Sequence, residues 1–138
     1  MAKTFMMKVN EIQPSQLYIS SEKLFRVEKS LDATNSGLVE PEPIKKLGND
    51  VVFVDGHTRA YVAFLRGFSE VPVYWEDEEL DWDACGIWVR WCKDEGIRSI
   101  GDLRNRVVSE KDYEMLWYAR CEEMQRSLTE RRTQQEHE

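Results

Sequence analysis

The 138-residue sequence lacks several features that would assign it to a broad class of protein. It has no excess of basic charge: its net charge of −7 argues against non-specific binding to DNA or RNA, because that affinity comes mainly from clustered lysines and arginines. No apolar run approaches the roughly 20 residues of a membrane span, and no signal-peptide pattern opens the chain. We therefore expect no nucleic-acid partner of this kind and no membrane partner.

Cysteine is also scarce. Cys85, Cys92 and Cys121 are odd in number, and none belongs to a C-x-x-C pair. This pattern indicates neither a structural zinc site nor a disulfide framework. A reducing, cytoplasmic location is expected.

The composition, 41% hydrophobic and 33% charged, is that of an ordinary soluble domain. β-prone runs and helical patterns mix up to about residue 79, and two or three helices follow, which predicts an α+β fold. We expect a core over 1–79, a helical extension over 80–128 packed on it, and a frayed tail over 129–138, where no apolar pattern continues. The extension offers a surface for a homodimer or a protein partner.

Local patterns set the expected elements. Apolar spacing predicts a helix that starts after Ser20 or Ser21 and ends at 35–37. "EPIKKL" and "VVFVD" read as a hairpin joined by "GND", and Pro72 suggests that "EVPVYWE" ends or edges a sheet. "SIGDLRNRVV" reads as a short helix with Ser99 and Asp102 in capping positions.

The most informative stretch is "VFVDGHTRAYVAFLRG", in which polar residues interrupt a strand-to-helix switch. A strand that ends at Val54, a tight turn at Gly56 and a helix that starts near His57 bring backbone N–H groups to one place. Such a helix N-terminus accepts anions. Arg59 adds a two-donor fork suited to phosphate. The turn therefore predicts a phosphate site.

The other polar residues of the turn have two readings each. Thr58 adds a hydroxyl donor. Asp55 either caps the helix or helps to hold a divalent ion between phosphate oxygens. His57 is either a donor or proton carrier, or a polar residue without a catalytic role. The prediction requires an open, positive mouth: acidic groups of the protein in that mouth, or Arg59 turned away from it, would contradict it.

The stretch "VEPEPIKKLGNDVVFVDGHTRAYVAFLRGFSEVPVYWED" resembles the core of the ParB/sulfiredoxin-like superfamily. Pro43-Ile44 matches the first box of that family, 56–59 match its phosphate-binding box, and 71–73 match its closing strand. The resemblance covers roughly the first 80 residues. It implies a small mixed sheet and a pocket for a nucleotide (ATP, ADP or CTP) with Mg²⁺.

The positions at which this chain differs from the family pattern indicate which of the family's activities to expect. Sulfiredoxins carry a reactive cysteine where this chain has His57, so sulfiredoxin activity is not expected. The partitioning ParB proteins have a Gly-Glu-Arg-Arg box followed by a helix-turn-helix reader, whereas this chain has Gly-His-Thr-Arg and a short acidic helical tail, so a DNA-sliding clamp is not expected. The turn is most similar to that of the free-serine kinases, whose general base would correspond to Glu22. Those kinases commonly have a second histidine where Thr58 stands.

Glu22 also has a simpler reading, because a glutamate in a first helical turn is favoured by the helix dipole. Three functions stay open: a phosphotransferase or nucleotide hydrolase, a non-catalytic ligand-sensing module, and a protein-interaction module. The phosphate-holding residues favour binding over turnover.

Overall fold

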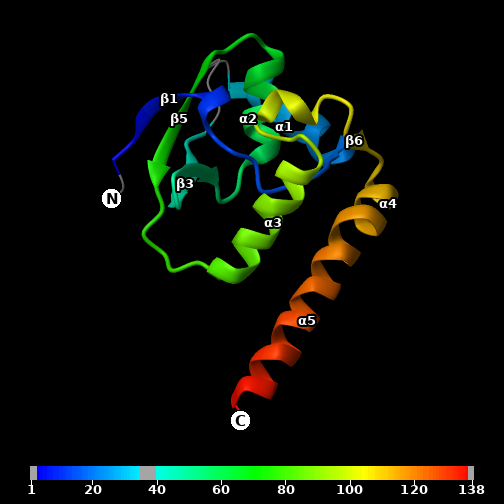
Figure 1. The fold of residues 1–138 in the computed structure, drawn as a ribbon. Helices are drawn as coiled ribbons and strands as arrows, with labels where there is room; N and C mark the ends of the chain where they lie inside the picture. The colour runs from blue at the N-terminus through cyan, green and yellow to red at the C-terminus, as the bar shows by residue number, and fades with distance from the viewer. Residues whose placement is uncertain (1–2, 35–39, 137–138) are drawn as a thin grey trace.

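The computed structural model describes residues 3–34 and 40–136. Its main sheet has four strands: β1 (Phe5–Lys8), β3 (Glu42–Leu47), β4 (Asp50–Phe53) and β5 (Glu70–Trp75). The order is β1-β5-β3-β4; β3 and β5 run parallel, and the other neighbours run antiparallel (Figure 1). The predicted α+β class is confirmed, and the sheet is mixed.

Two details of the sheet differ from expectation. The link between β3 and β4 has two residues rather than three, because Leu47 pairs with Asp50. Pro72 lies in an inner strand rather than an edge strand. It pairs with Met6 of β1 but lies outside the part of β5 that pairs with β3, which starts at Val73. Two parallel residue pairs form a second, small sheet from β2 (Ile19–Ser20) and β6 (Val107–Val108).

Helices α1 (Ser21–Thr34) and α2 (His57–Leu65) pack against each other. The side chain of Ser20 accepts a hydrogen bond from the backbone N–H of Lys23, so Ser20 caps α1 as one of the two expected candidates. The predicted exit of α1 at 35–37 lies outside the described residues. The short helix predicted over 99–108 is confined to η2 (Ile100–Leu103), with the expected capping box, and β6 follows it.

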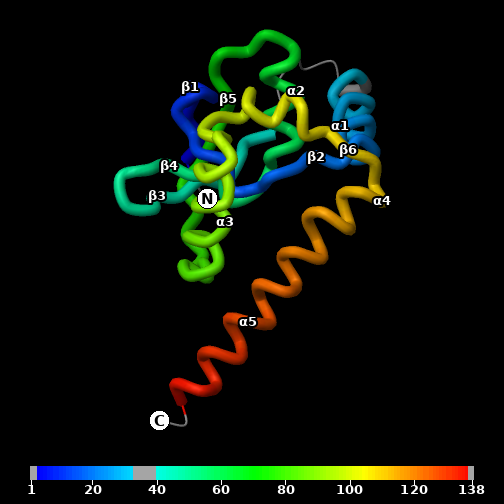
Figure 2. Tube along the Cα trace, turned by 45° about the vertical axis from the view of Figure 1, so that its right-hand side comes forward, coloured from blue at the N-terminus to red at the C-terminus, as the bar shows by residue number. Residues whose placement is uncertain are grey.

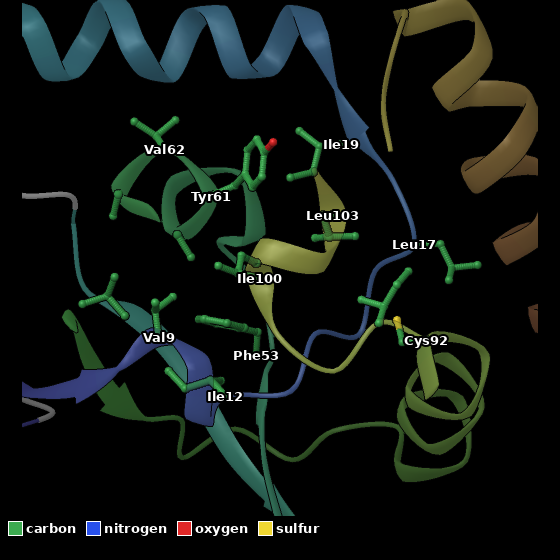
Figure 3. Packing of buried hydrophobic residues seen from close by; sticks show 14 of the residues in the cluster. Val9, Ile12, Leu17, Ile19, Phe53, Tyr61, Val62, Cys92, Ile100 and Leu103 are labelled. Atoms are coloured by element: carbon green, nitrogen blue, oxygen red, sulfur yellow. The ribbon is translucent and has the colours of Figure 1, made fainter. Parts of the chain in front are cut away.

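A short 3-10 helix, η1 (Val9–Glu11), leads into the main core. Figure 3 shows how side chains from distant parts of the chain meet there: Phe53 of β4, Tyr61 of α2 and Ile100 of η2 belong to one buried cluster. Cys92, Ile97, Leu103 and Trp117, all from the predicted extension, share it. Residues on both sides of position 79 therefore contribute to one core.

The remaining helices are α3 (Trp82–Asp94), α4 (Glu110–Tyr113), the π-helical turn η3 (Glu114–Tyr118) and α5 (Ala119–Glu136). The middle of α5 packs on α3 through Met124, Leu128 and Ala84. Its C-terminal end points away from the rest of the fold in both views (Figures 1 and 2). No helix in the described ranges combines the length and apolarity needed to cross a membrane.

The end of the chain corrects one expectation, since α5 continues through Glu136 instead of fraying from residue 129. Polar contacts support it where the apolar pattern stops. The Thr133 hydroxyl donates to the carbonyl of Thr129 at 2.9 Å, and Arg132 forms an ion pair with Asp81 at 2.7 Å. Such contacts are invisible to a search for apolar periodicity.

Candidate functional site

The predicted turn lies between β4 and α2, as its sequence indicates. Gly56 is the N-cap of α2 and has the left-handed backbone conformation, with φ 79°, which favours glycine. The backbone N–H of Gly56 donates to Oδ1 of Asp55 at 2.7 Å. The strand end is fixed by a hydrogen bond from the Val54 N–H to the Pro43 carbonyl at 3.0 Å. The turn therefore has the expected strand–glycine–helix geometry.

Arg59 points at this turn, but it is already in contact with two acidic side chains. Its Nη2 and Nε lie 3.0 and 3.2 Å from Oε2 of Glu42, and its Nη1 lies 3.3 Å from Oε2 of Glu40. The Arg59 side chain is 32% exposed, Glu42 is fully buried, and Glu40 is 83% exposed. We call Gly56 together with the Arg59 guanidinium the anion cradle.

Glu42 fills the cradle. A Cβ atom placed on Gly56 would lie 1.4 Å from Oε2 of Glu42, so the carboxyl group comes close only because residue 56 has no side chain. The expectation of an open, positive mouth is therefore wrong. Its physical reason is that a carboxylate from the first residue of β3 reaches the place where an external anion would lie.

The electrostatics of Glu42 are unusual. Burial raises the pKa of this carboxyl group to about 8, against the lowering effect of Arg59, while Asp55 and Glu40 raise it further. At pH 7 the group is mostly protonated, and its contact with Arg59 is then a hydrogen bond rather than a full ion pair. Its Oε1 has no hydrogen-bond partner among the described residues. The ionised partner of Arg59 is then the exposed Glu40, whose Oε2 lies 3.3 Å from Nη1.

His57 faces the interior. Its Nε2 accepts a hydrogen bond from the backbone N–H of Ser15 at 2.9 Å, and the Ser15 hydroxyl donates to the Phe53 carbonyl at 2.8 Å. Burial lowers the pKa of His57 to about 4, so the imidazole is neutral at pH 7. This arrangement ties the N-terminal segment to α2. It gives no support to His57 as a proton carrier at the surface.

Of the other predicted site residues, Thr58 is buried, whereas Asp55 and Glu22 are exposed to solvent. Thr58 is buried in the first turn of α2, whereas Asp55 is exposed and bonds the neighbouring Gly56 amide instead of serving as the N-cap. Glu22 is exposed in the first turn of α1. Within the parts of the chain that are described, it forms no hydrogen bond or ion pair with the turn. Its neighbour Lys23 lies near enough to act on the charge of His57.

Over residues 3–34 and 40–136, no group of three or more His, Cys, Asp or Glu side chains is arranged to hold a metal ion. The donors nearest the cradle are the carboxylates of Asp55, Glu40 and Glu42. Asp55 is bonded to Gly56, and both glutamates contact Arg59. In this arrangement these side chains do not form a Mg²⁺ site, so any metal would depend on phosphate oxygens for most of its ligands.

Two cavities flank the site. One of about 300 Å³ is lined by Thr4, Glu40, Pro41 and Tyr74, on the Glu40 side of the cradle. The other, of about 210 Å³, lies on the Ser15 side and is mainly apolar; Phe53, Leu80 and Trp88 contribute to its wall. Glu42 was not among the residues predicted from the sequence, because a glutamate is rarely buried and nothing local marks the one before Pro43-Ile44.

Comparison with known proteins assigns no family to the chain. No family model matches the chain, and no curated protein matches it. Among solved structures, it is similar to the crystal structure of protein Atu1540 from Agrobacterium tumefaciens, with a TM-score of 0.48 and 12% sequence identity. The match covers 80% of this chain and 63% of that one, so the chain spans less than two thirds of that protein's length.

Proposed function

We propose that this chain is a ParB/sulfiredoxin-like domain that binds the phosphate group of a nucleotide or another small phosphorylated ligand in the anion cradle. Glu42 closes the open mouth that the sequence predicted, so the proposal requires an incoming ligand to take the place of its carboxyl group. The contact between Arg59 and Glu42 supports the proposal, because it shows where such a ligand would be held. Two guanidinium nitrogens lie 3.0 and 3.2 Å from one carboxyl oxygen at the mouth of α2. The cradle therefore already has the geometry to hold one oxygen of an anion.

A phosphate would gain more from the cradle than a carboxylate does. It presents several equivalent oxygens to a planar guanidinium fork, and it carries more negative charge. The first-turn N–H groups of a helix and the helix dipole favour the same charge. Arg59 is one third exposed, so its guanidinium can be reached from solvent.

Binding is better supported than turnover. A phosphotransferase needs a base within hydrogen-bond reach of the acceptor hydroxyl. Glu22 is exposed on α1 without contact to the turn, and His57 is buried with Nε2 bonded to the Ser15 amide. We therefore place the kinase-type reaction second to a ligand-binding or ligand-sensing role.

The test is a thermal-shift series with ATP, ADP, CTP and inorganic phosphate, each with and without Mg²⁺, on the wild type and on Arg59→Ala. A ligand at about 100 times its Kd stabilises a fold by about 2.7 kcal/mol. We expect at least one phosphorylated ligand to stabilise the wild type and to lose that effect in Arg59→Ala.

Arg66→Ala is the matched control. Arg66 lies just past the other end of α2, has a side chain 33% exposed, and pairs with Asp32 at 2.9 Å. It has the exposure and pairing of Arg59 without the cradle, so this variant should keep the ligand effect. Equal ligand effects in Arg59→Ala and Arg66→Ala would contradict the proposed site.

A further inference from the structure

The Glu42 side chain makes the contacts expected of a bound ligand. Its Oε2 touches Arg59 and lies against Gly56, and the whole side chain is shielded from solvent. Its Oε1 is buried without a partner in the described part of the chain. A buried polar atom without a hydrogen bond costs free energy, so this arrangement is held at some expense to the fold.

The cradle cannot hold Glu42 and a second anion at once. The space next to the Gly56 Cα, which a ligand oxygen would need, is within 1.4 Å of Oε2 of Glu42. We propose that Glu42 is an internal ligand that an incoming phosphate displaces, and that it thereby determines which anions the cradle accepts. This inference rests on the proposed function.

Displacement selects for the charge of the incoming group. In the cradle, the Glu42 carboxyl group lies close enough to Asp55 of the turn and Glu40 ahead of β3 for both to raise its pKa. Both groups disfavour the ionised form of Glu42 in the cradle, so they do not hold it there against an incoming anion. A simple carboxylate ligand offers Arg59 no more than Glu42 does, whereas a phosphate monoester offers a second charge and further oxygens. The cradle should therefore accept phosphate and exclude acetate.

Displacement of Glu42 also makes anion binding depend on pH, because Glu42 loses a proton when it leaves the cradle. Inside the cradle the pKa of Glu42 is raised to about 8 by burial, and once displaced into solvent the group returns toward its ordinary 4.5. We call the protein closed when Glu42 lies in the cradle and open when Glu42 is displaced. Between pH 4.5 and about 8, Glu42 is protonated in the closed form and ionised in the open form, so opening releases a proton. Anion affinity should therefore rise with pH over this window and level off above about 8, because the closed form is favoured at low pH.

The direct test is isothermal titration of inorganic phosphate and of acetate into the wild type, Glu42→Ala and Glu40→Ala. Removing the Glu42 carboxylate empties the cradle, so we expect Glu42→Ala to bind phosphate at least about tenfold more tightly than the wild type and to bind acetate as well. Glu40→Ala is the matched control, because it removes the exposed partner of Arg59 and leaves the buried one. It should bind no acetate and should not show the full gain in phosphate affinity.

Equal phosphate affinity in Glu42→Ala and the wild type, with both lost in Arg59→Ala, would overturn the displacement and leave the proposed function intact. Absence of phosphate binding in every one of these variants would overturn both.

If Glu42→Ala does not fold, Glu42→Gln keeps the shape of the side chain and removes its titration. Sulfate, whose charge is constant over this range, should then gain about tenfold or more in affinity for the wild type between pH 6 and pH 8, and little for Glu42→Gln. The same pH dependence in both proteins would overturn the inference.

Discussion

Oε2 of Glu42 occupies the position where a Cβ atom of residue 56 would lie, so Gly56 and Glu42 fit together only as a pair. Gly56 also has a φ of 79°, which disfavours any side chain. The pair shows that the sharp turn before α2 serves two purposes. It starts the helix, and it makes room for the Glu42 carboxyl group at the helix mouth.

Gly56→Ala should lower the free energy of unfolding by more than backbone strain alone would. Gly67→Ala is its control, because Gly67 has a similar φ of 87° but nothing within 4 Å of an added Cβ. We expect about 1 kcal/mol of strain in each variant, and a further loss in Gly56→Ala from the overlap with Glu42. Urea unfolding of both variants measures the difference. Combining Gly56→Ala with Glu42→Ala should remove that further loss; a double variant as unstable as the sum of the two would contradict the pairing.

His57 should make the fold acid-sensitive. Its pKa is lowered from 6.5 to about 4 by burial, so the stability that it contributes is present above 6.5 and is lost as pH falls toward 4. The free energy of unfolding, measured by urea denaturation at several pH values, should fall over this range. His57→Gln should lower stability at pH 7 and flatten that part of the profile. An unchanged acid slope in the variant would show that other groups cause it.

Glu42 should act on stability at the opposite end of the pH range. Its folded pKa of about 8 exceeds the ordinary 4.5, so its favourable contribution is present below 4.5 and is lost as pH rises through about 8. Relative to Glu42→Gln, the wild type should lose up to about 1.4 kcal/mol per pH unit within this window. Parallel unfolding profiles of the two proteins from pH 5 to pH 9 would indicate that the carboxyl group ionises as freely in the fold as in the unfolded chain.

The packing of α5 on α3 gives a prediction independent of the cradle. Leu128 is buried against α3, whereas Leu116 in η3 is exposed. Leu128→Ala should cost about 2 kcal/mol or more and speed hydrogen exchange in α5, because it opens a cavity at that contact. Leu116→Ala should change little. Similar exchange in both variants would mean that α5 is not held by this contact.

The helical extension was also predicted to contact a homodimer mate or another protein. Met115, Leu116 and Tyr118 of η3 are exposed apolar side chains, which are compatible with such a contact. The oligomeric state, measured by sedimentation at several concentrations, tests the homodimer. The partner itself stays a prediction.

The fold was more predictable from sequence than the site. Apolar periodicity located α1 and α2, and the strand–Asp55–Gly56 pattern located the turn, because both depend on residues close together in the chain. Glu42 and Arg59 lie 17 residues apart, and their contact depends on how β3 pairs with its neighbours. The burial of His57 likewise depends on Ser15, 42 residues away. Local patterns identify the groups at a site, whereas their partners come from the tertiary fold.

The most direct test of the cradle is a titration of inorganic phosphate followed through backbone amide resonances. If phosphate binds in the cradle, the amides of Gly56, His57 and Thr58 should shift first and saturate together in Glu42→Ala, with weaker shifts of the same amides in the wild type. Shifts confined to other parts of the surface, or no shift at these three amides in either protein, would contradict it.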